Sequence, residues 1–133
     1  SLPSRGLGDV YKRQVNVGSI AGVTGIGSSI AYASSKGALL NMTKSLARAL
    51  GPIRVNAICP GFIQGDWLRN GLGDEVYEMV KESTEKATPL GLTVTADQVA
   101  DSIIYFVEDA VTTTGETLLL DGGMHLGGPV PLK

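Results

Sequence analysis

Tyr32 and Lys36 have the residue types and the spacing needed for proton transfer. They lie four positions apart at the start of a predicted helix, so their side chains share one helix face. A phenol is a weak acid, but a neighbouring ammonium group and a helix N-terminus both favour the phenolate. A tyrosine activated in this way can exchange a proton with a substrate oxygen, which is general acid–base chemistry.

The Tyr-x-x-x-Lys spacing alone is weak evidence, because Tyr77 and Lys81 repeat it. The two pairs differ in the residue that lies thirteen positions before each tyrosine. Ser19 lies thirteen residues before Tyr32 at the end of a predicted strand, whereas a loop residue lies at that distance before Tyr77. We therefore interpret Tyr77 as a half-buried aromatic residue on a surface helix and place the candidate chemistry at the first pair and Ser19.

Alternating strands and helices are predicted to position these residues. The predicted strands are residues 15–19, 53–59 and 117–120, and the predicted helices are residues 30–50, 74–86 and 95–109. Residues 20–29 and 62–73 are predicted to be loops, on their glycine content. This order indicates an α/β fold with parallel strands buried on both faces. Ligands in such a sheet bind beyond the carboxyl ends of the strands.

Composition narrows the classes of function. The 133 residues make one domain at most, and 43% hydrophobic content can build a core. Eleven Lys and Arg against thirteen Asp and Glu give a net charge of −2, which argues against nucleic-acid binding. The single cysteine, Cys59, suits a reducing compartment, so we expect a cytoplasmic protein. No apolar run approaches the roughly 18 residues of a membrane span, so no membrane association is expected.

Four segments resemble the short-chain dehydrogenase/reductase family, and in particular its 3-oxoacyl-carrier-protein reductases. They are residues 15–19, 31–38, 53–63 and 120–123, in the order and spacing of the family. The resemblance implies a Rossmann-like doubly wound sheet. It also implies an NAD- or NADP-dependent oxidoreductase that interconverts a ketone and a secondary alcohol.

The resemblance also implies roles for the matched positions. Ser19 would hydrogen-bond the substrate oxygen, Tyr32 would transfer the proton, and Lys36 would hold the nicotinamide ribose and favour the tyrosinate. The implied catalytic residues are Ser19, Tyr32 and Lys36, and the implied cofactor-binding residues are Tyr32, Lys36, Pro60, Gly61 and Ile63. Residues 65–90, with Trp67, Leu68, Tyr77 and Met79, would cover the substrate.

The partners implied are a small-molecule carbonyl or alcohol substrate and further copies of the same chain, as a homodimer or homotetramer. The cofactor carries the hydride, because no protein side chain does. The choice between NAD and NADP stays open. No metal is expected. His125 lacks partners at ligand spacing, so an exposed or interface position is predicted for it.

The chain departs from the family in what would be its first half. The glycine-rich turn that binds pyrophosphate, an Asn-Ala-Gly strand end and a catalytic Asn are absent from the sequence. The cluster at residues 22–27 has the spacing G-x-x-G-x-G and no acidic residue about 20 positions on, so it is interpreted as a flexible loop. Gly65 stands where the family usually has a Thr that contacts the nicotinamide amide.

We therefore expect residues 15–133 to be the C-terminal part of one Rossmann-fold domain. They would hold the last three of seven strands, the last two joined by a left-handed crossover. Residues 1–14 would be a non-homologous arm or an artefact, and the chain alone would be inactive. Two alternatives remain. One is a non-catalytic binding or interaction protein of the same fold, against which the joint presence of Ser19, Tyr32 and Lys36 argues. The other is a complete small protein with its own function.

Overall fold

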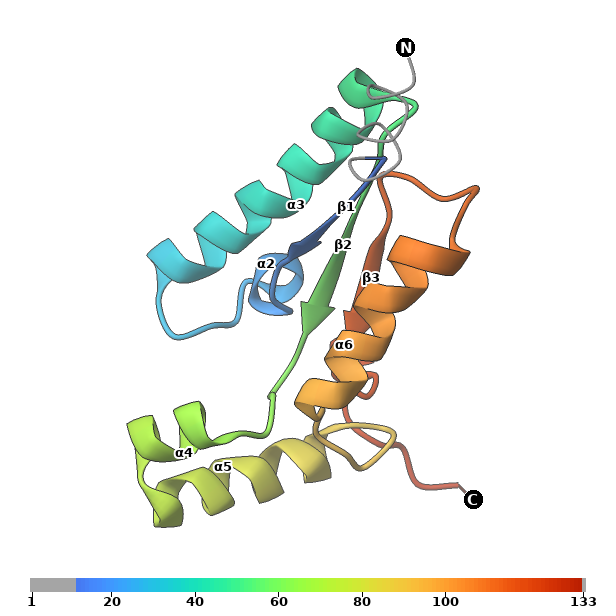
Figure 1. The fold of residues 1–133 in the computed structure, drawn as a ribbon. Coiled ribbons are helices and arrows are strands. Elements are labelled where there is room, and N and C mark those ends of the chain that lie inside the picture. The colour runs from blue at the N-terminus through green and yellow to red at the C-terminus, as the bar shows by residue number, and fades with distance from the viewer. Residues whose placement is uncertain (1–11, 133) are drawn as a thin grey trace.

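The computed structural model describes residues 12–132, which form a three-stranded parallel sheet with helices on both faces (Figure 1). The strands β1 (Arg13–Val17), β2 (Arg54–Pro60) and β3 (Thr117–Leu120) lie side by side in that order. β2 is central, and its residues 55–60 are all buried. This is the pattern of a parallel strand covered on both faces, so the predicted α/β fold is confirmed.

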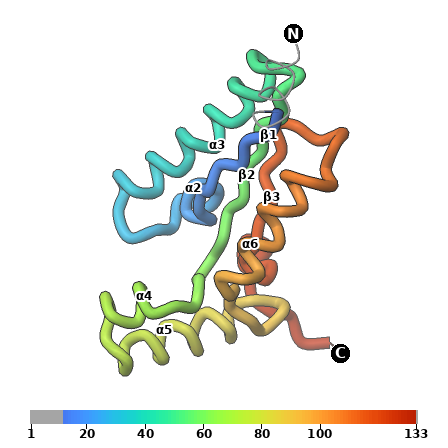
Figure 2. Tube along the Cα trace, viewed as in Figure 1, coloured from blue at the N-terminus to red at the C-terminus, as the bar shows by residue number. Residues whose placement is uncertain are grey.

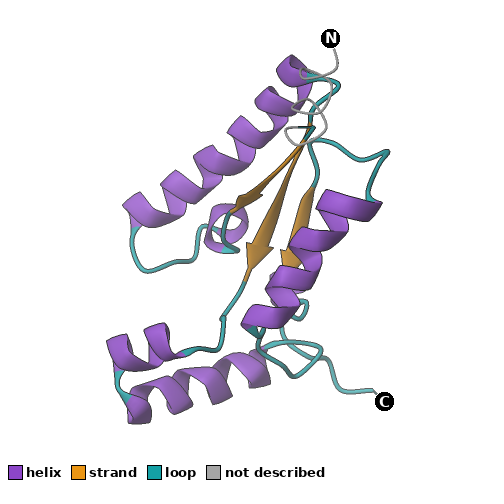
Figure 3. Ribbon diagram, in the orientation of Figure 1, coloured by secondary structure: helices purple, strands orange, loops and turns teal. Residues whose placement is uncertain are grey.

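The connecting helices cover opposite faces of the sheet (Figure 3). The longer helices are α3 (Ile30–Leu50), α5 (Asp74–Ala87) and α6 (Ala96–Ile104), and η1 (Tyr105–Asp109) is a π-helical turn that extends α6. On one face, Asn16 of β1 donates from Nδ2 to Oγ1 of Thr43 in α3 over 3.0 Å. On the other face, Ile58 of β2 packs with Phe106 of η1 in the hydrophobic core.

The second crossover is left-handed. The strands follow one another in the same direction across the sheet, while α3 and α6 lie on opposite faces, so the two crossovers have opposite hands. In Figure 1 the strands point downward, α6 lies in front of the sheet, and β3 lies to the right of β2. That arrangement makes β2–α6–β3 the left-handed connection, an exception to the general rule. The expectation drawn from the family resemblance is confirmed.

Local sequence signals set the helix ends. Ser29 precedes α3 and its Oγ accepts a hydrogen bond from the backbone N–H of Tyr32. Thr95 and Gln98 form the predicted capping box at the start of α6, with hydrogen bonds of 3.2 and 2.9 Å. α3 ends at Leu50, immediately before Gly51 and a proline, as predicted.

Two predictions of loop structure are wrong. Residues 20–29 contain the short helix α2 (Ala21–Thr24), and residues 62–73 contain α4 (Asp66–Leu72). Helices this short are not stable on propensity alone and depend on tertiary packing. α2 packs closely against α3, which the glycine-rich composition of the segment did not indicate.

The first strand begins earlier than predicted. β1 spans residues 13–17 rather than 15–19, so two residues assigned to the arm belong to the sheet. Pairing with β2 continues past the strand, because the N–H of Gly18 donates to the carbonyl of Ile58 over 2.8 Å. The rest of the predicted arm, residues 1–11, lies outside the described residues.

Two arginines fix the end of the α6–η1 helix to the sheet. Arg54 donates from Nη1 to the carbonyls of Phe106 and Ala110, both at 2.7 Å. Arg13, its register partner on β1, donates to the carbonyl of Val107 over 2.8 Å. Cations at a helix C-terminus are stabilised by the unpaired carbonyls and the helix dipole. The residues of this cap are more than 50 positions apart in the sequence, so no local pattern predicts it.

Helices α4 and α5 form a hairpin beyond the carboxyl ends of the strands (Figure 2). A single parallel bridge between Ile63 and Val94 ties the segment after β2 to the segment before α6. The hairpin is therefore held where ligands bind in sheets of this kind. Within residues 12–132, no helix has the length and apolar character needed to cross a membrane.

Candidate active site

Ser19 lies just beyond the carboxyl end of β1. Its backbone neighbour Ile20 donates to the carbonyl of Pro60 over 3.0 Å, which holds the segment beside the end of β2. The Oγ of Ser19 accepts a hydrogen bond from the N–H of Ala21 over 3.1 Å. Because a hydroxyl can accept and donate at once, this contact leaves the Ser19 proton available to a ligand.

Cys59 is a buried residue of β2. Burial raises the pKa of its thiol, while a hydrogen bond from the Ser19 backbone and the positive charge of Lys36 oppose that shift. Cys59 is fully buried, as predicted for a structural thiol.

Tyr32 and Lys36 share a face at the start of α3, as the spacing predicts. The Nζ of Lys36 lies 5.7 Å from the centroid of the Tyr32 ring, within the range of a cation–π contact. Tyr32 is 39% exposed, and its hydroxyl has no hydrogen-bond partner within residues 12–132. The phenol is therefore free to bind a ligand oxygen.

Two glycines set the distance between α2 and the tyrosine helix. A Cβ on Gly22 would lie 2.6 Å from the backbone carbon of Lys36, and a Cβ on Gly27 would lie 2.9 Å from the Cβ of Ala21 and 3.2 Å from the Tyr32 ring. Such separations are too short for any side chain without backbone movement. These glycines are therefore packing positions that bring α3 close to Ser19.

A pocket of about 490 Å³ opens beside Tyr32, in the size range of small-molecule sites. Its lining residues are Tyr32, Gly61, Phe62, Ile63, Gln64, Gly65, Asp66, Trp67, Leu68 and Ala96. Three predicted site residues, Tyr32, Gly61 and Ile63, thus meet in one cavity. Ser19, Lys36 and Pro60 do not line it.

Gly61 lies at the base of this pocket. Its N–H donates to the carbonyl of Leu120 over 2.9 Å, and a Cβ there would lie 3.2 Å from the Cβ of Asp121. The close approach keeps the backbone of β2 next to the end of β3. At the other end of the segment, no atom lies within 4 Å of a Cβ built on Gly65, so that position has room for a side chain.

Tyr77 contacts two residues that line the pocket, Phe62 and Gly65. Its side chain is 2% exposed, its hydroxyl accepts the N–H of Gly65 over 3.2 Å, and its ring packs 5.4 Å from that of Phe62. The guanidinium of Arg69 lies 4.3 Å above the same ring. The prediction of a half-buried aromatic residue is therefore wrong, because Tyr77 is buried. Tyr77 lies on the side of α5 that faces Phe62 and Gly65, which its spacing from Lys81 does not indicate.

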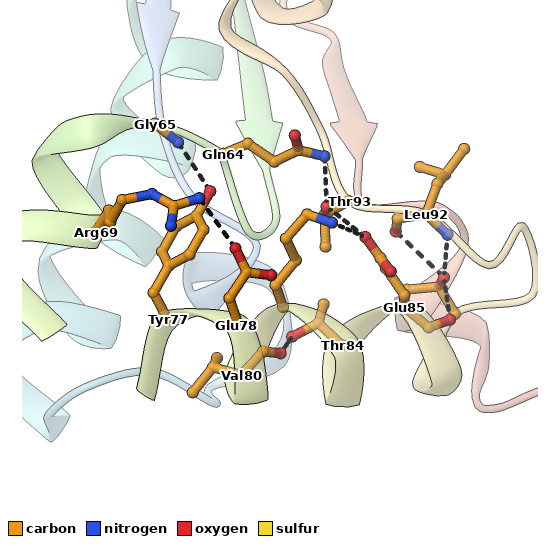
Figure 4. A network of polar contacts seen from close by, with 12 residues as sticks. Gln64, Gly65, Arg69, Tyr77, Glu78, Val80, Thr84, Glu85, Leu92 and Thr93 are labelled. Carbon is orange, nitrogen blue, oxygen red and sulfur yellow. Dashed lines mark hydrogen bonds and ion pairs between the residues drawn. The ribbon is translucent and has the colours of Figure 1, made fainter. Parts of the chain in front are cut away.

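A polar network anchors the hairpin on its other side (Figure 4). Gln64 donates to Oγ1 of Thr93 over 2.8 Å, and Thr93 donates to Oε1 of Glu85 over 3.1 Å. Lys81 pairs with the same carboxylate at 2.9 Å, and this hydrogen bond is the main cause that lowers the pKa of Glu85. The charged face of α5 was predicted to be solvated, but Glu85 instead joins α5 to the segments around the pocket.

His125 pairs with a buried carboxylate. Its Nδ1 lies 2.9 Å from Oδ2 of Asp121, which also accepts the backbone N–H of His125, while Oδ1 accepts the N–H of Gly123. Asp121 therefore caps this turn. Across residues 12–132, no three His, Cys, Asp or Glu side chains are grouped so that they could hold a metal ion.

The described residues fit one end of a nicotinamide dinucleotide. Tyr32, Gly61 and Ile63 border an open pocket with room for a planar ring, and Lys36 supplies a cation beside it. Gly22 and Gly27 face α3 and its tyrosine, so these two glycines are not placed to approach a pyrophosphate.

The sequence matches a family model described as enoyl-(acyl carrier protein) reductase over residues 8–125. It is 42% identical over 113 residues to a protein named as ketoacyl reductase 2 of the granaticin polyketide synthase of Streptomyces violaceoruber. It is 36% identical over 114 residues to the 3-oxoacyl-(acyl-carrier-protein) reductase of Rattus norvegicus. Each match covers 84% of this chain and 44% of the relative, so the chain spans less than half of their length.

The chain is also similar to solved dehydrogenase structures, of which it again covers about half. The chain is similar to a small-chain dehydrogenase in complex with NADPH, at 25% identity and a TM-score of 0.79, over 86% of this chain and 52% of that one. It is also similar to a 4-hydroxyisoleucine dehydrogenase complexed with NADH, at 27% identity and a TM-score of 0.75, over 95% of this chain and 54% of that one.

Proposed function

The chain belongs to the short-chain dehydrogenase/reductase family, and from this premise we propose that it carries the proton-transfer site of an NAD(P)-dependent oxidoreductase. The reaction interconverts a ketone and a secondary alcohol. The observation that carries the proposal is the Tyr32 hydroxyl, which borders the pocket without an internal partner and has the Lys36 ammonium over its ring at 5.7 Å.

Each side chain has a distinct part in the proposed reaction. Tyr32 gives its phenolic proton to the substrate oxygen during reduction and takes it back during oxidation. The Ser19 hydroxyl donates a hydrogen bond to the same oxygen, since its lone pair already accepts the N–H of Ala21. Lys36 favours the tyrosinate left after proton transfer, because its positive charge lies next to the ring.

The nicotinamide supplies the hydride when it is bound, and we propose that Pro60, Gly61 and Ile63 line it. Gly61 and Ile63 border the pocket, which supports this role, whereas the carbonyl of Pro60 accepts the N–H of Ile20. NAD and NADP are both candidates, since one similar structure holds NADPH and another holds NADH.

We further propose that the 133-residue chain alone binds either dinucleotide weakly. Tight binding in this fold depends on a pyrophosphate held by a glycine-rich helix N-terminus, and this sequence has no such turn. Calorimetric titration of the chain with NADH and NADPH is expected to show no micromolar affinity. Micromolar binding would reveal a self-sufficient site and contradict this part of the proposal.

The activity is tested in a chimera. Residues 15–126 replace the matching segment of the 42%-identical relative from Streptomyces violaceoruber, which supplies the rest of the fold. We expect ketone-dependent oxidation of NADH or NADPH. A folded chimera that binds the cofactor but turns over no ketone would support the alternative, a non-catalytic binding protein of this family.

A further inference from the structure

We propose that the pocket beside Tyr32 accepts an uncharged, apolar ketone or secondary alcohol and disfavours anionic substrates. The proposal rests on the proposed function and adds the class of substrate. The cavity is defined by the lining residues given above, and is called the Tyr32 pocket below. Two features of that cavity carry the proposal: its apolar walls and the carboxylate of Asp66 among its lining residues.

The walls of the Tyr32 pocket offer few polar groups to a ligand. Phe62, Ile63, Trp67 and Leu68 supply most of the large side chains. One of the two N–H donors of the Gln64 side chain is already engaged with Thr93. A ligand body placed against these walls gains affinity from buried apolar surface, which a charged group would forfeit.

One acidic residue lines the pocket. Asp66 is among the lining residues and lies in the first turn of α4. Asp74 and Glu78 of the neighbouring helix do not line the pocket and both pair with Arg69. The Asp66 carboxylate is therefore the charge of its own sign that an entering carboxylate or phosphate meets.

The nearby cations are committed elsewhere. Arg69 pairs with Asp74 at 3.5 Å and with Glu78 at 3.0 Å, and its guanidinium stacks on the Tyr77 ring below the pocket wall. Lys36 lies over the Tyr32 ring and is not among the lining residues. No lining residue of the Tyr32 pocket is a cation that could pair with an anionic substrate.

The single tryptophan of the chain provides a direct readout. Trp67 lines the pocket and is 87% exposed, so a ligand that enters should change its fluorescence. We would titrate the full chain with benzylacetone and with its para-carboxylate, which differ by one negative charge, and repeat both titrations by calorimetry. The neutral ketone is expected to bind at least about fivefold more tightly, and added salt should narrow the gap.

Two charge variants test whether the Asp66 carboxylate causes the preference for the neutral ketone. Asp66→Asn is expected to strengthen binding of the carboxylate severalfold more than it changes binding of benzylacetone, so the ratio of the two affinities falls. The matched control is Glu82→Gln, which removes a negative charge from α5 at a residue that pairs with Lys86 and does not line the pocket. That control should alter neither affinity.

Three results would overturn the proposal. They are equal or tighter binding of the carboxylate, no response to Asp66→Asn, and no saturable binding of benzylacetone by either method. These results are independent of hydride transfer. An active chimera that prefers anionic ketones would contradict the substrate class alone, whereas a chain that selects neutral ketones beside an inactive chimera would contradict only the proposed reaction.

Discussion

At the residue scale, the candidate site depends on two glycines as well as on its polar side chains. Gly22 lies against the backbone of Lys36, and Gly27 lies between Ala21 and the Tyr32 ring. These contacts bring the start of α3 next to the segment that carries Ser19. Gly22 and Gly27 are thus close-packed positions, whereas residues 25–29, between α2 and α3, keep the loop structure that the composition predicts.

Gly22→Ala should destabilise the chain. The new Cβ would lie 2.6 Å from the Lys36 carbonyl carbon and 2.8 Å from the Gly37 nitrogen, and neither backbone atom can move without shifting α3. Forced overpacking of this kind costs about 1–3 kcal/mol. Urea denaturation measures the loss. Gly71→Ala is the control, because nothing lies within 4 Å of that Cβ and the helical substitution should be neutral or stabilising. Equal effects at both positions would contradict the packing role.

The shared helix face of Tyr32 and Lys36 could be predicted from spacing, but the surroundings of these candidate site residues could not. Tyr32 and Lys36 share a face because they are four residues apart on a helix, which holds for any helix. The burial of Tyr77 depends on the hairpin folding back onto the segment after β2, and only tertiary structure shows this.

At the element scale, the α4–α5 hairpin is the part of the site that the sequence located least well. Its anchors join three segments: the turn after β2, helix α5 and the stretch before α6. Residues at positions 64, 85 and 93 are distant in sequence, so no local pattern connects them. By contrast, α3 and β3 were predicted with their observed bounds, because periodicity, capping and glycine stops act locally.

The Glu85 anchor should make stability depend on acid. Hydrogen bonds from Lys81 and Thr93 lower the pKa of Glu85 below its unfolded value of 4.5. The stabilisation is therefore present above that value and is lost as the pH falls through the lowered pKa of the folded state. Thermal melts of the parent chain and of Glu85→Gln should converge as the pH falls below 4.5 and through the lowered pKa of Glu85. Glu82→Gln, on the exposed face of α5, should keep the parental pH profile. Parallel curves for Glu85→Gln and the parent would contradict the anchor.

At the scale of the whole molecule, a large share of apolar surface stays exposed. Ile30 is 88% exposed and Met42 47% on α3, Val17 is 47% exposed on β1, and Ile104 is 50% exposed on α6. On the same helix, Ala33 and Ala47 are buried within the chain. Uncovered apolar strands and helices favour association with other chains.

We predict that the chain self-associates through α3. Light scattering at micromolar concentration should give a mass above that of one chain, and Met42→Lys should shift the population toward monomer. Met79→Lys is the control, because Met79 is 62% exposed but lies on α5. A monomeric parent chain, or equal effects of the two substitutions, would exclude this interface.

The central claim, that Tyr32 transfers the proton, is tested most directly by kcat of Tyr32→Phe in the chimera described above. The substitution keeps the ring over which Lys36 lies and removes only the hydroxyl. General acid–base catalysis predicts a fall of roughly 100-fold or more in ketone-dependent NAD(P)H oxidation, with cofactor affinity retained. Tyr105→Phe, at a 48% exposed residue of η1, should keep the parental rate. A Tyr32→Phe chimera with near-parental kcat would contradict the account.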